Sequence, residues 1–330
     1  MRRAVLMLLA ACGSSSGKAT TDGPPGGGDG PPGMGDSSTD SPAAVARTIF
    51  VIPMENEPSS AIYGNTTDAP YINSLMAGAA YATKFQDELP ALPSEPHYVW
   101  MEAGTNAFSD ITFTNDNAPS SSHSTASTAH LTTQLNAANV TWTSYQQGIT
   151  AGTCPIAASG VYAPKHDPVV FFQDIAGSPP SKTNAGCIAH HKPYTAFPAD
   201  LQQPASMAQY VFITPDLCHD MHGDASCPQG TNVAANIKAG DTWLSSELPP
   251  ILDYANAHDG VVFLVWDEGD SSNLIPFLAL GPRIKPGAVA TTYSHSSQVK
   301  SIEEMLGVPV LPTVTSANDF ADLFQAGMFP

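Results

Sequence analysis

Residues 48–54 read Thr-Ile-Phe-Val-Ile-Pro-Met, and Glu55 and Asn56 follow directly. The run is short, continuous and apolar, and it contains several β-branched and aromatic side chains. Such a run is typical of a strand that is buried on both faces of a sheet. The stretch therefore indicates the interior strand of a sheet that helices cover on both sides.

Similar runs recur along the chain and alternate with segments of helical character. Further strands are expected at 169–172, 210–214, 261–266 and 276–280, and helices at 129–138, 241–257 and 298–306. An Asp, Asp241, and a Ser stand at the starts of the last two helices, where they can cap free N–H groups. The alternation predicts an α/β fold with an open, mainly parallel sheet and helices on both faces. Residues 106–127 are rich in Ser, Thr, Asn and Asp, and we expect a long ordered loop over one edge of the sheet.

Polar side chains follow three of these runs. In an open α/β sheet, ligands bind beyond the carboxyl ends of the strands. Carboxylates, an amide and imidazoles offer oxygen and nitrogen ligands for a hard or borderline divalent metal. A single acidic residue after a strand is often only a helix cap or a solvated loop residue, but three groups on one edge favour a site. The residues concerned are Glu55, Asn56, Asp216, His219, Asp220, His222, Asp267, Glu268 and Asp270.

The composition limits the partners of the protein. The chain has 330 residues, which suits one large domain or two modest ones. Lys+Arg 12 against Asp+Glu 30 give a formal net charge of -18. Nucleic acid and anionic membrane surfaces are poor partners for such a protein, because both attract clusters of Lys and Arg. A phosphorylated substrate would need a metal ion or a local histidine cluster to receive it.

The N-terminus has the pattern of an export signal. Arg2 and Arg3 precede an apolar run at 4–11 that ends at Cys12. This resembles the bacterial lipobox, whose cysteine becomes the lipid-modified first residue of the mature protein; the alternative is an ordinary secretion signal with an incidental Cys12. The 34 residues at 13–46 include 9 Gly and 5 Pro, so a flexible tether is expected there rather than a core.

These features predict a signal peptide at 1–11, a lipid-anchored tether at 12–46 and a folded domain at 47–330. The protein would then be an exported cell-envelope lipoprotein that contacts the membrane only through its anchor.

The other cysteines agree with export. Four remain after Cys12, and an even number in an exported chain favours two disulfides. A zinc site is the competing interpretation, but the spacings are irregular and no C-x-x-C pair occurs. Of the three possible connectivities, local pairing is the simplest: Cys154 with Cys187, and Cys218 with Cys227.

Four motifs occur in order along most of the predicted domain. They are Met-Glu-Asn at 54–56, Phe-Ile-Thr-Pro-Asp-Leu-Cys-His-Asp-Met-His at 212–222, Trp-Asp-Glu-Gly-Asp at 266–270 and Tyr-Ser-His-Ser-Ser at 293–297. Together they resemble the bacterial phosphoesterase family that contains phospholipases C and certain acid phosphatases, within the alkaline-phosphatase-like superfamily. The resemblance implies a three-layer α/β/α sandwich with a mainly parallel central sheet. It also implies a divalent metal ion held by Glu55, Asn56, Asp267 and Glu268.

The resemblance further implies a hydroxyl nucleophile. In the family the nucleophile follows a run of the kind found at 91–98, Ala-Leu-Pro-Ser-Glu-Pro-His-Tyr, and ends a segment that here reads Glu-Ala-Gly-Thr at 102–105. Thr105 is the residue so indicated, as a nucleophile that also contacts the metal and forms a phosphothreonine. Two departures bear on what the pocket accepts. Glu57 replaces the histidine of Glu-Asn-His, and Pro-His-Tyr at 96–98 stands where many relatives read Leu-Pro-Asn-Tyr.

A departing alkoxide needs a proton, which His222 or His219 is suited to donate. His166, Asp220 and His295 are further candidates for contact with the substrate, although a structural role is the alternative for each histidine. The histidines at 97, 123, 130 and 258 are expected to be structural or exposed, and the sequence indicates no role for His190 or His191.

These residues predict an enzyme that hydrolyses phosphate esters, of the acid phosphatase or phospholipase C type, acting on a small phosphoester or a phospholipid. The sequence argues against a sulfatase, whose nucleophile is a Cys or Ser followed by x-Pro-x-Arg, because no cysteine here has that pattern. The alternative from another class is a surface lipoprotein that binds a metal or phosphoryl ligand without turnover. A purely structural envelope protein would have no reason to gather these side chains on one edge.

Overall fold

The computed structural model describes residues 47–269 and 273–329. Within these residues an eight-stranded sheet has the order β10-β2-β9-β7-β1-β6-β4-β5, and a small sheet has the order β11-β3-β8. The strands are β1 (Ile49–Met54), β2 (Ala80–Ala82), β3 (Phe85–Gln86), β4 (Trp142–Gln146), β5 (His191–Pro193), β6 (Tyr210–Thr214), β7 (Val261–Trp266), β8 (Leu274–Ile275), β9 (Phe277–Leu280), β10 (Gly287–Val289) and β11 (Tyr293–Ser294). The α-helices are α1 (Ser59–Ile62), α2 (Pro70–Leu75), α3 (Ser94–Ala103), α4 (Leu131–Ala137), α5 (Gln173–Ala176), α6 (Ala185–His190), α7 (Phe197–Leu201), α8 (Val233–Ala257) and α9 (His295–Leu306).

Strand β1 is an interior strand of the large sheet, as its sequence predicts. All six of its residues are buried, and it pairs in parallel with β6 on one side and β7 on the other. Met54 at its end is level with Trp266 at the end of β7. The sheet is mainly parallel, because β9 alone runs against its neighbours β7 and β2. The carboxyl ends of β1, β6 and β7 therefore meet at one edge.

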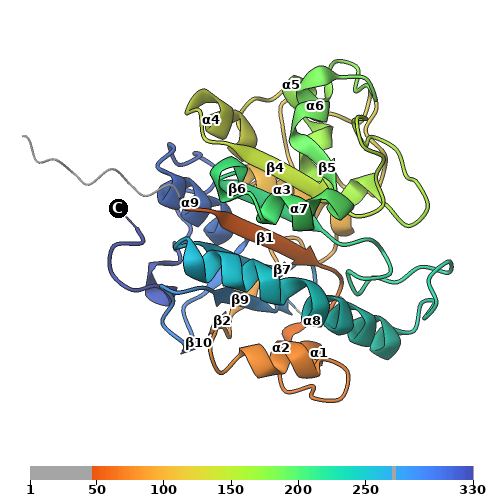
Figure 1. The fold of residues 1–330 in the computed structure, drawn as a ribbon. Coiled ribbons are helices and arrows are strands. Elements are labelled where there is room, and N and C mark those ends of the chain that lie inside the picture. The colour runs from red at the N-terminus through yellow and green to blue at the C-terminus, as the bar shows by residue number, and fades with distance from the viewer. Residues whose placement is uncertain (1–46, 270–272, 330) are drawn as a thin grey trace, which may run out of the picture. The chain divides into compact units, whose positions relative to one another are not determined.

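Helices cover both faces of the large sheet. Figure 1 shows α8 in front of it, and α3 and α9 behind it. The Phe50 ring of β1 packs edge-on against Phe197 of α7 at 6.3 Å and Tyr254 of α8 at 5.7 Å. Phe263 of β7 contacts Phe320 at 5.4 Å between ring centroids. The predicted α/β fold with a mainly parallel central sheet is confirmed.

Two predicted elements differ from the structure. Residues 169–172 were expected to form a strand, but Pro168–Phe171 is a turn of 3-10 helix. A short apolar run does not distinguish a strand from a buried helical turn, and a proline at the first helical position favours the turn. Helix α8 begins at Val233, eight residues before the predicted start, with the Asn232 side chain as its cap. Asp241 instead accepts hydrogen bonds from the first N–H groups of α2.

The two predicted disulfides are present. Cys154 is bonded to Cys187, and Cys218 to Cys227. The second bridge closes the loop that follows β6 and carries three of the candidate site residues. The segment 106–127 is an ordered loop with isolated bridges between residues 107 and 112 and between 120 and 123.

The predicted signal peptide at 1–11 and tether at 12–46, with Cys12, lie outside the described residues. Among the helices of residues 47–269 and 273–329, none combines the length and the apolar character needed to cross a bilayer.

Candidate active site

The ends of β1 and β7 place four polar side chains together. Glu55 and Asn56 follow β1, and Asp267 and Glu268 follow β7. The Asn56 backbone N–H donates to Asp267 Oδ1 at 3.0 Å, and the Asp267 N–H donates to the Met54 carbonyl at 3.0 Å. The Asn56 amide group lies 3.1 Å from Glu268 Oε1 and 3.3 Å from Glu55 Oε2. Side chains separated by more than 200 residues thus form one cluster, where the sheet-edge rule places them.

Helix α3 brings a hydroxyl to this cluster. It begins at Ser94, whose Oγ donates to Glu55 Oε2 at 3.0 Å and lies 3.4 Å from Glu268 Oε1. Ser94 is buried, and its position in the first turn puts the hydroxyl at the positive end of the helix dipole. The site therefore combines a nucleophile candidate, two carboxylates and a favourable helix end.

The cluster holds more negative charge than its own cations balance. Burial, with repulsion from Glu55 and Glu268, raises the pKa of Asp267 well above its usual range. Burial and Glu55 have the same effect on the pKa of the nearby Asp220. Burial also raises the pKa of Glu268 to about 7, although His97 opposes this. These carboxylates can all be ionised at neutral pH only if a further cation joins them.

The donor atoms fit a divalent cation. Glu55 Oε1 and Asp267 Oδ2 are buried and have no hydrogen-bond partner among the described residues. Buried anionic oxygens without partners are costly, and they are satisfied when they coordinate a metal. Carboxylate, amide and hydroxyl oxygens are the ligands that hard divalent cations prefer. Glu55, Asn56, Asp267, Glu268 and the Ser94 hydroxyl could supply them.

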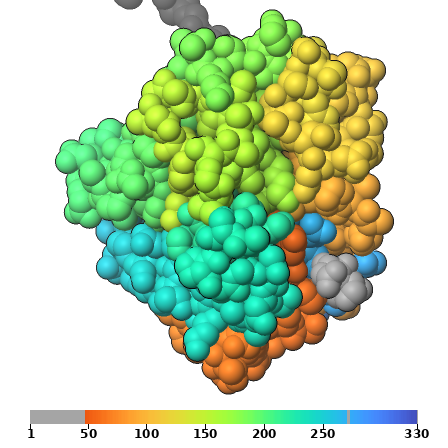
Figure 2. Space-filling model, turned by 90° about the vertical axis from the view of Figure 1, so that its right-hand side faces the viewer, coloured from red at the N-terminus to blue at the C-terminus, as the bar shows by residue number. Residues whose placement is uncertain are grey.

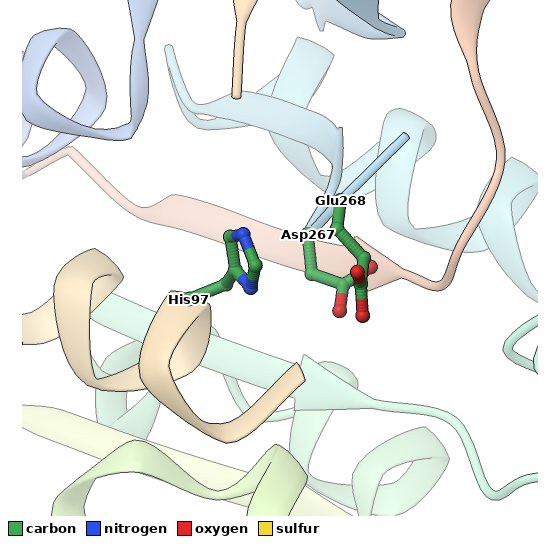
Figure 3. Close-up of side chains that lie close together, drawn as sticks. All are labelled: His97, Asp267 and Glu268. Carbon is green, nitrogen blue, oxygen red and sulfur yellow. The ribbon is translucent and has the colours of Figure 1, made fainter. Parts of the chain in front are cut away.

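His97 also lies at the cluster, as Figure 3 shows, with ligand-type atoms within 4.8 Å of those of Asp267 and Glu268. Its Nδ1 lies 2.9 Å from the Pro93 carbonyl oxygen and its Nε2 2.9 Å from Asp87 Oδ1. Both partners accept, so both nitrogens donate. Burial lowers the pKa of His97, but the Asp87 carboxylate outweighs burial and raises it. Because hydrogen bonds occupy both ring nitrogens, His97 is a less suitable metal ligand than the carboxylates of Asp267 and Glu268.

Thr105 lies away from the cluster. It stands two residues beyond the end of α3, whereas Ser94 begins this helix of 10 residues. At 1.5 Å per residue the two helix ends are about 15 Å apart. The Thr105 hydroxyl instead accepts a hydrogen bond from the Ala107 N–H at 3.1 Å. The geometry is therefore incompatible with Thr105 as nucleophile and metal ligand, and it offers Ser94 in its place.

His166 and Asp220 support the cluster from behind. His166 Nε2 lies 3.3 Å from Glu55 Oε1, and its Nδ1 lies 3.3 Å from Asp220 Oδ2, without the angles of good hydrogen bonds. The ring stacks on Tyr98 at 4.9 Å and is buried. Burial lowers the pKa of His166 well below its usual value. The His166 ring therefore lies between the Glu55 and Asp220 carboxylates, whereas the sequence suggested that His166 and Asp220 contact the substrate.

His222 lies at the front of the cluster. Its Nδ1 is 2.7 Å from the Gly223 carbonyl, which can only accept, so Nδ1 carries a proton. Its Nε2 lies 3.4 Å from the Lys165 ammonium nitrogen. The Asp220 carboxylate accepts the His222 backbone N–H at 2.8 Å. His222 is therefore held through Nδ1, and a substrate oxygen that replaces the Lys165 contact can exchange a proton with Nε2.

His219 faces elsewhere. Its Nδ1 is bound to Asp216 Oδ1 at 2.8 Å, and its side chain lines a groove of about 490 Å³ against α8, beside Lys238 and Trp243. The side chain is 38% exposed, so it is a less suitable acid for the cluster than His222.

His295 is buried and does not reach the solvent. It begins α9, is fully buried, and its Nε2 is 2.9 Å from the Trp266 carbonyl. Burial and the neighbouring His97 lower the pKa of His295 to about 4. His295 thus holds the end of β7, directly before Asp267.

The sequence comparison identifies the family. The profile of the Phosphoesterase family matches residues 63–309, about three quarters of the chain. The chain belongs to the Phosphoesterase family. This phosphoesterase is 29% identical over 279 residues to a phosphatidylinositol-3-phosphatase of Mycobacterium tuberculosis, covering 84% of this chain and 82% of that protein. It is 27% identical to a phosphate-repressible acid phosphatase of Penicillium chrysogenum, covering 66% of this chain and 50% of that one. The protein is therefore a phosphoric ester hydrolase.

Several solved structures share the fold of this chain. A protein of the alkaline phosphatase superfamily from Vibrio parahaemolyticus superposes with a TM-score of 0.55 at 11% identity, covering 83% of this chain and 69% of that one. A phosphonate monoester hydrolase from Silicibacter pomeroyi gives 0.54 at 11% identity, covering 83% and 76%. At such identities the likeness concerns the fold alone, which this chain shares with both structures.

Sequence reasoning did not find Ser94. A signal for it existed, because Pro-Ser-Glu at 93–95 has the proline and acidic residue that mark the start of a helix. The sequence analysis considered the residues that follow β1, β6 and β7. Ser94 instead begins a helix that does not directly follow any predicted strand in the sequence.

Proposed function

We propose that this phosphoesterase cleaves phosphate monoesters with Ser94 as nucleophile and a divalent cation held by Glu55, Asn56, Asp267 and Glu268. The observation that carries the proposal is the Ser94 hydroxyl, 3.0 Å from Glu55 and at the first turn of α3. A bound divalent cation would lower the pKa of the serine hydroxyl and stabilise negative charge on the phosphoryl oxygens.

The residues of the chain divide the remaining work. Ser94 Oγ attacks phosphorus, and Glu55 Oε2, which already accepts its hydrogen bond, is the nearest acceptor for its proton. The bond between phosphorus and the ester oxygen breaks, and the departing oxygen takes a proton from Nε2 of His222, which enters this step protonated on both ring nitrogens. The products of this step are the alcohol and a phosphoserine. A water molecule then attacks phosphorus and gives a proton to His222, and the bond between phosphorus and Ser94 Oγ breaks. Glu55 returns its proton to Ser94 Oγ, which releases inorganic phosphate and restores the free serine.

Two features favour a monoester substrate. The relatives are named as phosphatases, one of them for a phosphatidylinositol phosphate and two as acid phosphatases. A monoester carries more negative charge than a diester, so a bound divalent cation would attract it more strongly. The lipid anchor at Cys12 and export remain part of the proposal, and the two disulfides agree with an oxidising compartment.

Binding without turnover is the competing function. It differs from hydrolysis in one respect that can be measured, the release of inorganic phosphate. Full-length protein loaded in turn with Mg²⁺, Mn²⁺, Zn²⁺ and Ca²⁺ is assayed on a chromogenic monoester and a diester. We expect monoester hydrolysis with at least one cation and its loss on chelation. Stoichiometric binding of the monoester without phosphate release would establish the competing function.

A further inference from the structure

We infer that Lys165 binds the phosphoryl group beside Ser94, and that Asp116 of the long polar loop positions the lysine for this role. The inference deepens the proposed function and rests on it. Neither residue directly follows β1, β6 or β7. Asp116 lies in the loop at 106–127, and Lys165 lies in a 3-10 turn at Pro164–His166.

Lys165 lies between the proposed nucleophile and the proposed acid. Its Nζ is 3.3 Å from Ser94 Oγ, 3.4 Å from His222 Nε2 and 2.7 Å from Asp116 Oδ2. An ammonium group has three N–H donors, so these contacts account for all of them. The contact with Asp116 is the shortest of the three. The longer contacts, with Ser94 and His222, lie on the side of the ammonium group where a substrate would bind. A phosphoryl oxygen next to Ser94 Oγ would replace those longer contacts.

The site needs such a cation. Its acidic side chains repel a phosphate dianion, and one divalent metal leaves little positive charge after it is shared by several carboxylates. Within the part of the chain that the structure describes, Lys165 is the only lysine or arginine whose charged group contacts Ser94. A fixed cation placed where charge develops on the transferred phosphoryl group stabilises the transition state.

Asp116 joins the lysine to the nucleophile helix. One carboxylate oxygen binds Lys165, and the other accepts the Glu95 backbone N–H at 3.0 Å, in the first turn of α3. The side chain of Glu95 in turn holds the loop, by accepting the Asn117 N–H at 2.6 Å and lying 2.5 Å from His123 Nε2. The Asp116 carboxylate therefore fixes the Lys165 ammonium relative to Ser94, and the polar loop at 106–127 becomes part of the active site.

The test compares Lys165→Met, Lys165→Arg, Asp116→Asn and the double variant Lys165→Met/Asp116→Asn in the full chain. A matched control comes from Lys192, which pairs with Asp200 at 2.8 Å on the surface: Lys192→Met removes a lysine–aspartate pair that does not contact the cluster. Each protein is assayed for kcat/KM on a chromogenic monoester and for the inhibition constant of inorganic phosphate, with thermal melting as a check of folding. Asn at 116 keeps an oxygen to accept the Glu95 N–H, so it removes the charge and not the helix cap.

We expect Lys165→Met to lower kcat/KM by about 10²–10³ and to weaken inhibition by phosphate at least tenfold. Lys165→Arg should recover part of kcat/KM and part of the inhibition by phosphate. Lys192→Met should stay within twofold of wild type in both.

Asp116→Asn alone should weaken phosphate inhibition several-fold. It should cause no further loss in the Lys165→Met background, because Asp116 acts through the lysine. Unchanged phosphate inhibition in Lys165→Met would overturn the role of the lysine, and additive losses would overturn the positioning role of Asp116. If wild type releases no phosphate, the proposed function fails, and calorimetry with inorganic phosphate then decides the Lys165 inference separately.

Discussion

The Ser94 hydroxyl donates a 3.0 Å hydrogen bond to Glu55, a residue 39 positions earlier in the chain. Glu55 directly follows the interior strand β1, and Ser94 begins helix α3 behind the sheet. Because the strand and helix termini meet, the same few ångströms hold a buried carboxylate, a hydroxyl and the positive end of a helix. The account of the reaction depends on this contact.

The crowding of carboxylates predicts a particular pH dependence for metal-free protein. Asp267, Asp220 and Glu268 have raised pKa values in the folded chain, and that of Glu268 is about 7. A raised carboxyl pKa means that the folded state binds protons more tightly than the unfolded state. Stability is then highest below the unfolded pKa of about 4 and falls as the pH rises through the folded values. We expect the melting temperature of chelator-treated protein to fall between about pH 4.5 and pH 7.5.

Asp267→Asn separates stability from activity in the same experiment. With one repelling charge removed, the metal-free variant should melt several degrees above metal-free wild type at pH 7.5, since about 1 kcal/mol corresponds to roughly 2–4 °C for a domain of this size. It should lose phosphatase activity by several decades and bind divalent metal more weakly. Melting scans with chelator and with added cation measure both effects. A variant that melts below wild type without metal would show that the carboxylates do not repel one another.

The sheet-edge cluster was largely predictable from sequence, whereas Ser94, the proposed nucleophile, was not. The apolar runs at 49–54, 210–214 and 261–266 form strands, as the sequence predicts. Because these strands are parallel, the residues that follow them meet at one edge of the sheet. Ser94 depends instead on how α3 lies against the sheet, where Tyr98 contacts Phe212 of β6, and no local pattern encodes this contact. The predicted cap Asp241 shows the same limit, because its partners at Tyr71 and Ile72 are about 170 residues away.

The two disulfides should differ in what they stabilise. The bridge between Cys154 and Cys187 closes 33 residues, and that between Cys218 and Cys227 closes 9. Loss of the longer bridge, tested as Cys187→Ser with Cys154→Ser, should cost about 2–4 kcal/mol of folding free energy. Loss of the shorter bridge should cost less stability and more activity, because its loop carries Asp220 and His222. Urea melts and kcat/KM on both double variants test this, and equal effects on activity would refute it.

His222→Ala should reveal the leaving-group acid. Esters of poorly departing alcohols should be hydrolysed about 10²–10⁴ more slowly, whereas esters of activated phenols, whose oxygen needs no proton, should be nearly unaffected. His219→Ala is the matched control from the same loop, and its rates should show no dependence on the leaving group. Plots of log rate against leaving-group pKa decide. A steeper slope for His219→Ala alone would exchange the two assignments.

The anchor prediction is tested in cells that export the protein. Cys12→Ser should move the protein from the membrane fraction to the soluble fraction and leave phosphatase activity per molecule unchanged, because the domain from residue 47 onward contains the entire proposed site. Fractionation followed by immunoblotting and activity assay measures both. Wild-type protein found in the soluble fraction would show that Cys12 carries no lipid.

The nucleophile is the central claim, and acid-quenched phosphoenzyme measures it most directly. Wild type, Ser94→Ala and Thr105→Ala are mixed with a ³²P-labelled monoester, quenched in acid within milliseconds, digested and mapped by mass spectrometry. We predict label on the peptide that contains Ser94, no label and an activity loss of several decades in Ser94→Ala, and normal labelling in Thr105→Ala. Label on Thr105, or near-normal turnover by Ser94→Ala, would contradict the account.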